Sequence, residues 1–146
     1  MWTMITEENN MATYNKFNSF VEALAEKVHN LGSDQISVAL TNTAPNTTNT
    51  QLSNITEISY TNCSSRNITT TSSEQTSGTY KLVLQDLVLT ASGGTVGPFR
   101  YIVLYNNTAT NDELIAYFDY GASITLQNGE TLTLDFDATN GVLTIA

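Results

Sequence analysis

The order of apolar and polar residues divides the chain into a short N-terminal part with a helical period and a longer part with the period of β-strands. Six apolar residues between positions 17 and 28 recur every three or four residues, which places them on one side of a helix. The sequence therefore predicts one amphipathic helix over about residues 14–30, capped by Thr13 or Asn15 and stopped by Asn30-Leu31-Gly32. We expect its apolar side to pack on the protein's own sheet or on a neighbouring subunit.

From Gln35 onward, apolar residues alternate with polar ones, as in half-buried strands. Residues 99–105 are apolar or aromatic at both parities except at Arg100, which predicts a central strand covered on both faces. The parity changes near Gln85-Asp86, where we expect a bulge or a switch between strands. The expected strand segments are 36–41, 57–61, 66–71, 79–90, 99–105, 113–120, 122–126, 131–136 and 142–146.

Polar segments rich in Asn, Thr, Ser and Gly separate these strands. Residues 42–56 predict a long exposed loop and residues 72–78 a polar turn, whereas Asn128-Gly129 between alternating segments is typical of a hairpin. Together the pattern predicts a mainly β fold: an antiparallel β-sandwich, jelly-roll or Ig-like, of about eight strands with one N-terminal amphipathic helix. We expect residues 11–146 to form this single domain.

The first ten residues are set apart by a second methionine, Met11. The segment Glu7-Glu8-Asn9-Asn10-Met11 can be back-translated as GAG-GAA-AAT-AAT-ATG, which resembles a ribosome-binding site followed by a start codon. We therefore expect residues 1–10 to be a translated leader; the alternative is an ordinary flexible N-terminal tail. Without Glu7 and Glu8 the formal net charge changes only from −9 to −7.

Composition and charge exclude several classes of partner. The chain has 146 residues, of which 13% are charged, and its formal net charge is −9 with five Lys and Arg residues. Phosphate neutralisation needs clustered basic residues, so we expect no nucleic-acid binding. No apolar run approaches the roughly 20 residues that cross a bilayer, so we expect no membrane partner. One cysteine forms no internal disulfide.

Groups for acid, base, nucleophilic or metal chemistry are scarce. The single His29 ends the predicted helix and is interpreted as a cap or surface residue, and the single Cys63 lacks a nearby cationic run that would activate it. Asp135 and Asp137 could bind calcium, but an outward strand residue and an Asx turn explain them better. We therefore predict no catalytic residue, no cofactor and no metal, and expect the protein not to be an enzyme.

Aromatic residues gather in two neighbouring predicted strands, at 99–105 and 113–120. One interpretation is an aromatic core with hydroxyl groups at its margin. The alternative is that one parity, including Tyr105 and Tyr117, contributes to a contact surface, because tyrosine is enriched at protein interfaces.

Several segments resemble small virion-associated structural proteins of tailed bacteriophages, and the resemblance spans nearly all of residues 11–146. They are not mechanistic motifs. The segments that carry it are Tyr14-Asn15-Lys16-Phe17-Asn18-Ser19-Phe20-Val21-Glu22-Ala23-Leu24-Ala25, His29-Asn30-Leu31-Gly32, Val38-Ala39-Leu40-Thr41-Asn42-Thr43-Ala44-Pro45, Ile55-Thr56-Glu57-Ile58-Ser59-Tyr60 and Asn128-Gly129-Glu130-Thr131-Leu132-Thr133-Leu134-Asp135-Phe136.

The resemblance implies a β-rich protein made in many copies in the cytoplasm of a bacterial host and incorporated into the virion. The role we expect is a capsid decoration or cement protein, bound to the major capsid protein or other virion proteins as a homo-oligomer, with a trimer favoured. The alternatives are a tail, neck or fibre component, or a carbohydrate-binding module. The expected partner interface comprises Tyr14, Phe17, Phe20, Val21, Leu24, Pro45, Leu52, Tyr105 and Tyr117.

Overall fold

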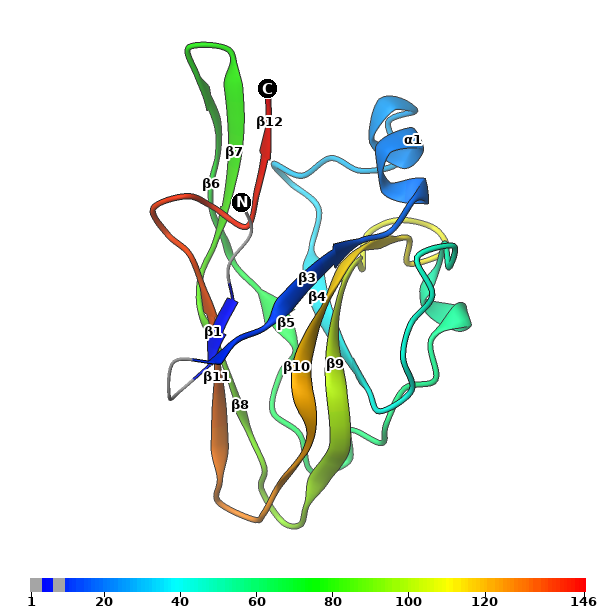
Figure 1. Cartoon of the computed structure of the whole chain (residues 1–146), viewed down its shortest axis with the longest axis vertical. Helices are drawn as coiled ribbons and strands as arrows, with labels where there is room; N and C mark the ends of the chain where they lie inside the picture. Colours follow the sequence, from blue (N-terminus) through cyan, green and yellow to red (C-terminus); the bar gives the residue numbers. More distant parts are fainter. Residues whose placement is uncertain (1–3, 7–9) are drawn as a thin grey trace.

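The computed structural model describes residues 4–6 and 10–146, with side chains from residue 12 onward. Within these residues the chain is mainly β, and twelve strands in antiparallel sheets accompany one α-helix and one short 3-10 helix (Figure 1). The predicted fold class is confirmed at this level. The described strands outnumber the eight or so expected, because several short pairings carry no alternation long enough to be visible in the sequence.

The largest sheet has five strands in the order β3-β10-β9-β4-β5, and all its neighbours are antiparallel. Its strands are β3 (Thr13–Lys16), β10 (Leu114–Leu126), β9 (Val96–Asn106), β4 (Ile36–Thr41) and β5 (Asn67–Ile68). β9 lies in the middle of this sheet, so the prediction of a central strand over residues 99–105 is confirmed.

Two smaller sheets lie one above the other on the other side of the molecule (Figure 1). Their orders are β2-β1-β11-β8 and β12-β7-β6. The strands are β1 (Met4–Thr6), β2 (Asn10–Met11), β11 (Thr131–Phe136), β8 (Leu87–Thr90), β12 (Leu143–Ile145), β7 (Thr79–Leu84) and β6 (Thr70–Thr76). The chain passes from β7 to β8 at Gln85-Asp86, so the predicted break in phase there is confirmed.

The main hydrophobic core lies between these layers. One parity of β9 and β10 supplies Ile102, Leu104 and Phe118, while Leu89 of β8 and Leu134 of β11 meet them from the opposite layer. All five of these side chains are essentially buried. In β11 alternation places the apolar Leu132, Leu134 and Phe136 inward, as the sequence pattern predicts.

A second, smaller cluster lies on the outer face of the five-stranded sheet. Val103 and Tyr105 of β9 pack there against Phe17 and Ile55, and Leu52 of the 3-10 helix η1 (Leu52–Asn54) adds to it. The polar loop of residues 42–56 therefore lies along the sheet and covers part of its outer face. This cluster is why β9 is apolar at both parities.

The helix α1 (Ser19–Ala25) is much shorter than the predicted 14–30. Thr13 and Asn15 are not its caps, because both lie in β3, which pairs with the edge of β10 in a register that sets Asn15 opposite Tyr117. Its other end comes before Lys27, which has a left-handed φ of 66°, so the predicted stop at residues 30–32 is wrong as well. Residues 13–16 precede the apolar residues that recur with a helical period, and pairing with the open edge of β10 gives them interstrand hydrogen bonds instead.

Three further sequence predictions differ from the structure. Residues 57–61 form no strand, and residues 72–78 are not a turn, since β6 runs through most of them and pairs with β7. Asn128-Gly129 does turn the chain, but the segments on either side do not pair with each other. β10 ends against β9, whereas β11 pairs with β8 and β1, so the turn carries the chain from one layer to the other.

The predicted leader lies partly within the described residues. β1 pairs with β11 in a register that sets Met4 opposite Phe136, and it also pairs with β2. Residues 1–3 and 7–9 lie outside the described residues. The proposal that translation starts at Met11 stays a prediction, which the intact mass of the native protein would test.

Candidate functional site

Half-exposed tyrosines lie on the outer face of the five-stranded sheet, beyond the part that the 42–56 loop covers. Tyr101 of β9 is paired with Asp119 of β10, and Tyr117 lies two residues before Asp119 on the same face. Tyr105 has the same parity but is buried in the second cluster. We call the surface formed by Arg100, Tyr101, Tyr117 and Asp119 the tyrosine face.

Ring contacts hold the two tyrosines in place. The Tyr117 ring lies 5.3 Å from that of the buried Phe17 and 6.2 Å from that of Tyr101, the latter pair meeting at an interplanar angle of 70°. The Arg100 guanidinium carbon lies 5.4 Å from the centre of the Tyr101 ring. Edge-to-face pairs and cation–π contacts of this kind fix the rings in one arrangement.

A bidentate ion pair closes one end of the tyrosine face. Arg100 Nε donates to Asp119 Oδ1 at 2.7 Å and Arg100 Nη2 donates to Asp119 Oδ2 at 3.0 Å. The Gly121 backbone N–H donates to the same Asp119 Oδ1 at 2.8 Å. The hydrogen bond from Arg100 lowers the pKa of the Asp119 carboxyl, so the pair stays charged at neutral pH. At a surface, this bidentate geometry fixes the orientation of the two side chains but adds little stability.

The tyrosine face has the chemistry of a contact surface. Tyrosine and arginine are the residues most enriched among those that dominate binding energies at protein interfaces. Both tyrosines are already held by ring contacts, so a partner would order few additional side-chain torsions on binding.

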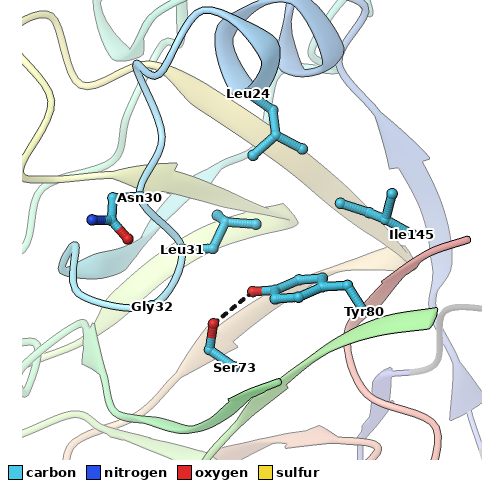
Figure 2. A pocket seen from close by; sticks show the side chains of 7 residues that line it. All are labelled: Leu24, Asn30, Leu31, Gly32, Ser73, Tyr80 and Ile145. Carbon is cyan, nitrogen blue, oxygen red and sulfur yellow. Dashed lines mark hydrogen bonds between the residues drawn. The ribbon is translucent and has the colours of Figure 1, made fainter. Parts of the chain in front are cut away.

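A groove of about 270 Å³ opens between the segment that contains α1 and the β12-β7-β6 sheet. Figure 2 shows Leu24 and Leu31 on one side of it and Tyr80 and Ile145 on the other. The Ser73 and Tyr80 hydroxyl groups share a hydrogen bond of 2.8 Å. Asn30 and Gly32 complete the lining. The groove is therefore mainly apolar with a polar margin, and Ile145 is 41% exposed within it.

The predicted interface residues are divided among three places. Phe17, Phe20 and Tyr105 are buried within the chain itself. They therefore lack the accessible surface that the predicted interface required. Val21 is 53% exposed on α1, and Leu24 of the same helix lines the groove. The four other residues are each half-buried: Tyr14 packs on the main core, Leu52 and Tyr117 on the second cluster, and Pro45 lies in the long loop.

The residues considered for chemistry have structural surroundings. His29 is 4% exposed, so its assignment as a surface residue is wrong: the segment after α1 folds back on the end of β9. Burial raises the pKa of the half-buried Cys63 thiol. Asp137 accepts hydrogen bonds from the backbone of Thr139 and Asn140, as in an Asx turn. Among residues 4–6 and 10–146, no three His, Cys, Asp or Glu side chains gather in a way that could hold a metal ion.

No family model, curated protein or solved structure matches this chain. In the part of the chain that the structure describes, no helix has the length and apolar character to cross a membrane.

Sequence reasoning missed the partners of several site residues. Tyr101 shares its parity with Tyr105, and this alternation could have placed it on the outer face. The Arg100–Asp119 pair and the Tyr80–Ile145 side of the groove depend on strand register, for which the sequence carries no local signal.

Proposed function

We propose that this chain is a capsid decoration or cement protein of a tailed bacteriophage, which binds the assembled head and stabilises it through contacts between capsomers. A protein that binds only the assembled state shifts the assembly equilibrium toward that state. The observation that carries the proposal is the tyrosine face, a preordered aromatic and arginine surface on the rigid central sheet. The resemblance of the sequence segments to virion-associated proteins supplies the class of partner.

We also propose that the layers form a β-sandwich of the jelly-roll or Ig-like type. The support is the main core, which joins one face of the five-stranded sheet to strands of the two smaller sheets. A sandwich supports β9 and β10 on their inner face, and these two strands carry all four residues of the tyrosine face on the outer one.

Binding to heads tests the proposal. Tyr117→Ala is expected to weaken binding to purified heads that lack the protein by about 30-fold, because truncating a central interface aromatic costs about 2 kcal/mol or more. Val88→Thr is the matched control: Val88 is 49% exposed and lies on β8 in the opposite layer. Cosedimentation of each folded variant with heads measures the affinity.

Equal binding by the wild type and Tyr117→Ala would exclude the tyrosine face as the contact. If purified heads bind neither the wild type nor any variant, although virions contain the protein, it would belong to the tail, neck or fibre instead. The number of copies in each virion separates these locations independently, because the copy number of a shell protein rises with the number of capsomers.

The oligomeric state gives a second expected result. We expect size-exclusion chromatography with light scattering to show a trimer with three times the 15.9 kDa mass of the chain. A mass of one chain at every concentration would contradict the trimer, although a monomer could still bind an assembled shell.

A carbohydrate-binding module is the second candidate. Half-exposed tyrosine rings beside hydrogen-bonding Arg100 and Asp119 are the observation that favours it, because sugars stack on aromatic rings. A glycan array with the wild type and Tyr101→Ala distinguishes it: a hit that disappears in the variant would support this function over the structural one.

A further inference from the structure

His29 is held against the end of β9 by the Asn106 side chain. The Asn106 Nδ2 amide lies 3.1 Å from His29 Nδ1 and 2.6 Å from Asp34 Oδ2, while the Asn106 Oδ1 oxygen accepts the backbone N–H groups of Thr108 and Ala109 at 3.0 and 3.1 Å. His29 and Asn106 are 4% and 1% exposed. The cluster thus joins the segment after α1 to the middle strand of the five-stranded sheet.

These contacts fix the orientation of the Asn106 amide and with it the protonation of the histidine. A flipped amide would set its oxygen against the Asp34 carboxylate and its NH₂ against two backbone N–H donors. The NH₂ group therefore faces His29, and His29 Nδ1 must accept its hydrogen. Only the neutral imidazole with its proton on Nε2 can do so.

Protonation of His29 would set two donors against each other. A proton on Nδ1 would face the Asn106 NH₂ group, which cannot turn away. His29 Nε2 is buried and has no hydrogen-bond partner among the described residues, so the charged ring gains nothing there. The Phe20 ring, 5.3 Å away, adds an apolar neighbour.

Two carboxylates face His29 and raise the pKa of its imidazole, but their effect is smaller than that of burial. Asp34, in the loop after α1, and Glu113, just before β10, both favour a protonated ring. Burial disfavours the charge more strongly, and the pKa of the His29 imidazole is lowered from its ordinary value of 6.5. Release of the ring to water would restore that value.

We propose that His29, Asn106 and Asp34 form an acid-sensitive latch, which adds to the packing of the buried Phe20 and Leu31 in holding residues 18–34 against the end of β9 at neutral pH, and which favours their release when His29 is protonated. The segment is anchored at both ends: Asn18 donates its N–H to the Thr47 carbonyl, and Gln35 donates its N–H to Thr108 Oγ1. Leu24 and Leu31 lie between these anchors and form one side of the groove. Release therefore widens the groove and increases the exposure of Tyr80 and Ile145, which are already partly exposed. This inference does not depend on the proposed function.

The direction of the pH effect follows from proton binding. Between the lowered pKa of the latched ring and 6.5, the released form binds the proton and the latched form does not, so acid favours release. At pH 5.0 the equilibrium constant between the latched and the released form is expected to shift toward release by up to about 30-fold relative to neutral pH, as set by the 1.5 pH units below 6.5. At pH 7.5 the effect is close to zero, because only about one-tenth of the released rings are protonated.

Nitrogen NMR of the wild type tests the latch without any variant. The chain has one histidine, so the imidazole signals need no assignment by mutation. We expect the Nε2–H tautomer at pH 7.5 and a pKa below 6.5. An Nδ1–H tautomer, or a pKa of 6.5 or higher, would overturn the proposal.

Hydrogen exchange locates the release. With intrinsic exchange rates corrected for pH, peptides from residues 18–34 should lose protection between pH 7.5 and 5.0, while peptides from β8 and β11, which do not line the groove, serve as the internal control. His29→Gln keeps a hydrogen-bond acceptor that does not titrate, and its residues 18–34 should be equally protected at both pH values. The same loss in His29→Gln as in the wild type would refute the latch, and if that variant does not fold, the wild-type exchange and tautomer still decide.

Discussion

Replacing Phe118 with alanine is expected to lower the free energy of unfolding by about 3–5 kcal/mol, the usual cost of removing a buried phenylalanine ring. Phe118 is fully buried at the centre of the main core. On β10 it lies between Ile102 of β9 and Tyr14 of β3, and its ring meets that of Tyr14 edge-on at 5.6 Å. The variant would lose both the core contacts and the ring that fixes the edge strand.

Urea denaturation followed by circular dichroism measures this change. Val88→Thr serves as the control, because Val88 is half-exposed on the opposite layer and surface substitutions usually stay within about 0.5 kcal/mol. A loss of less than about 1 kcal/mol in Phe118→Ala would mean that the two layers do not share one packed core around this ring. The same result would weaken the proposed sandwich.

The strands that could be predicted are those in which alternate residues are apolar and pack into the main core. β4, β9 and β11 bury alternate apolar residues against the main core, so their pattern reports their structure directly. β9 is apolar at its second parity as well, which predicts a central strand. The structural reason is that this parity packs under the long polar loop. In these segments local sequence and tertiary packing agree.

The elements that sequence reasoning missed are stabilised by their neighbours. β6 is almost entirely polar and half-exposed or exposed, and its strand conformation follows from pairing with β7. β3 directly precedes the helical period of residues 17–28, and it lies at the free edge of β10, where backbone hydrogen bonds favour an extended chain. Propensity is a weak signal where a sheet edge offers such partners.

The candidate sites depend on contacts between residues that are far apart in the sequence. Asn106 reaches Asp34 across 72 residues and His29 across 77, so no local motif contains the latch. Arg100 and Asp119 are 19 residues apart and meet only because β9 and β10 pair in this register. The aromatic content of both strands was visible in the sequence, but Tyr105 is buried and Tyr101 half-exposed because Phe17 and Ile55, from distant segments, pack on Tyr105.

Gly97→Ala is expected to destabilise the protein by about 2–5 kcal/mol, from backbone strain together with overpacking. Gly97 lies near the start of β9 with a φ of +126°, a conformation that a residue with a side chain rarely adopts. An added Cβ would lie 2.7 Å from the Ile124 carbonyl oxygen and 3.0 Å from the Thr125 Cα. Both are backbone atoms of β10, so neither can move without disturbing the pairing of the two strands.

Gly129→Ala separates the two causes. Gly129 also has a positive φ, of +90°, but an added Cβ there would meet nothing within 4 Å. Its alanine variant should therefore lose only the conformational part, about 1–2 kcal/mol. Equal losses in the two variants, measured by urea denaturation, would show that the contact with β10 contributes nothing. If the contact matters, Gly97→Ala should also weaken the proposed binding to heads, because β9 and β10 position Tyr101 and Tyr117, whereas Gly129→Ala should leave that binding unchanged.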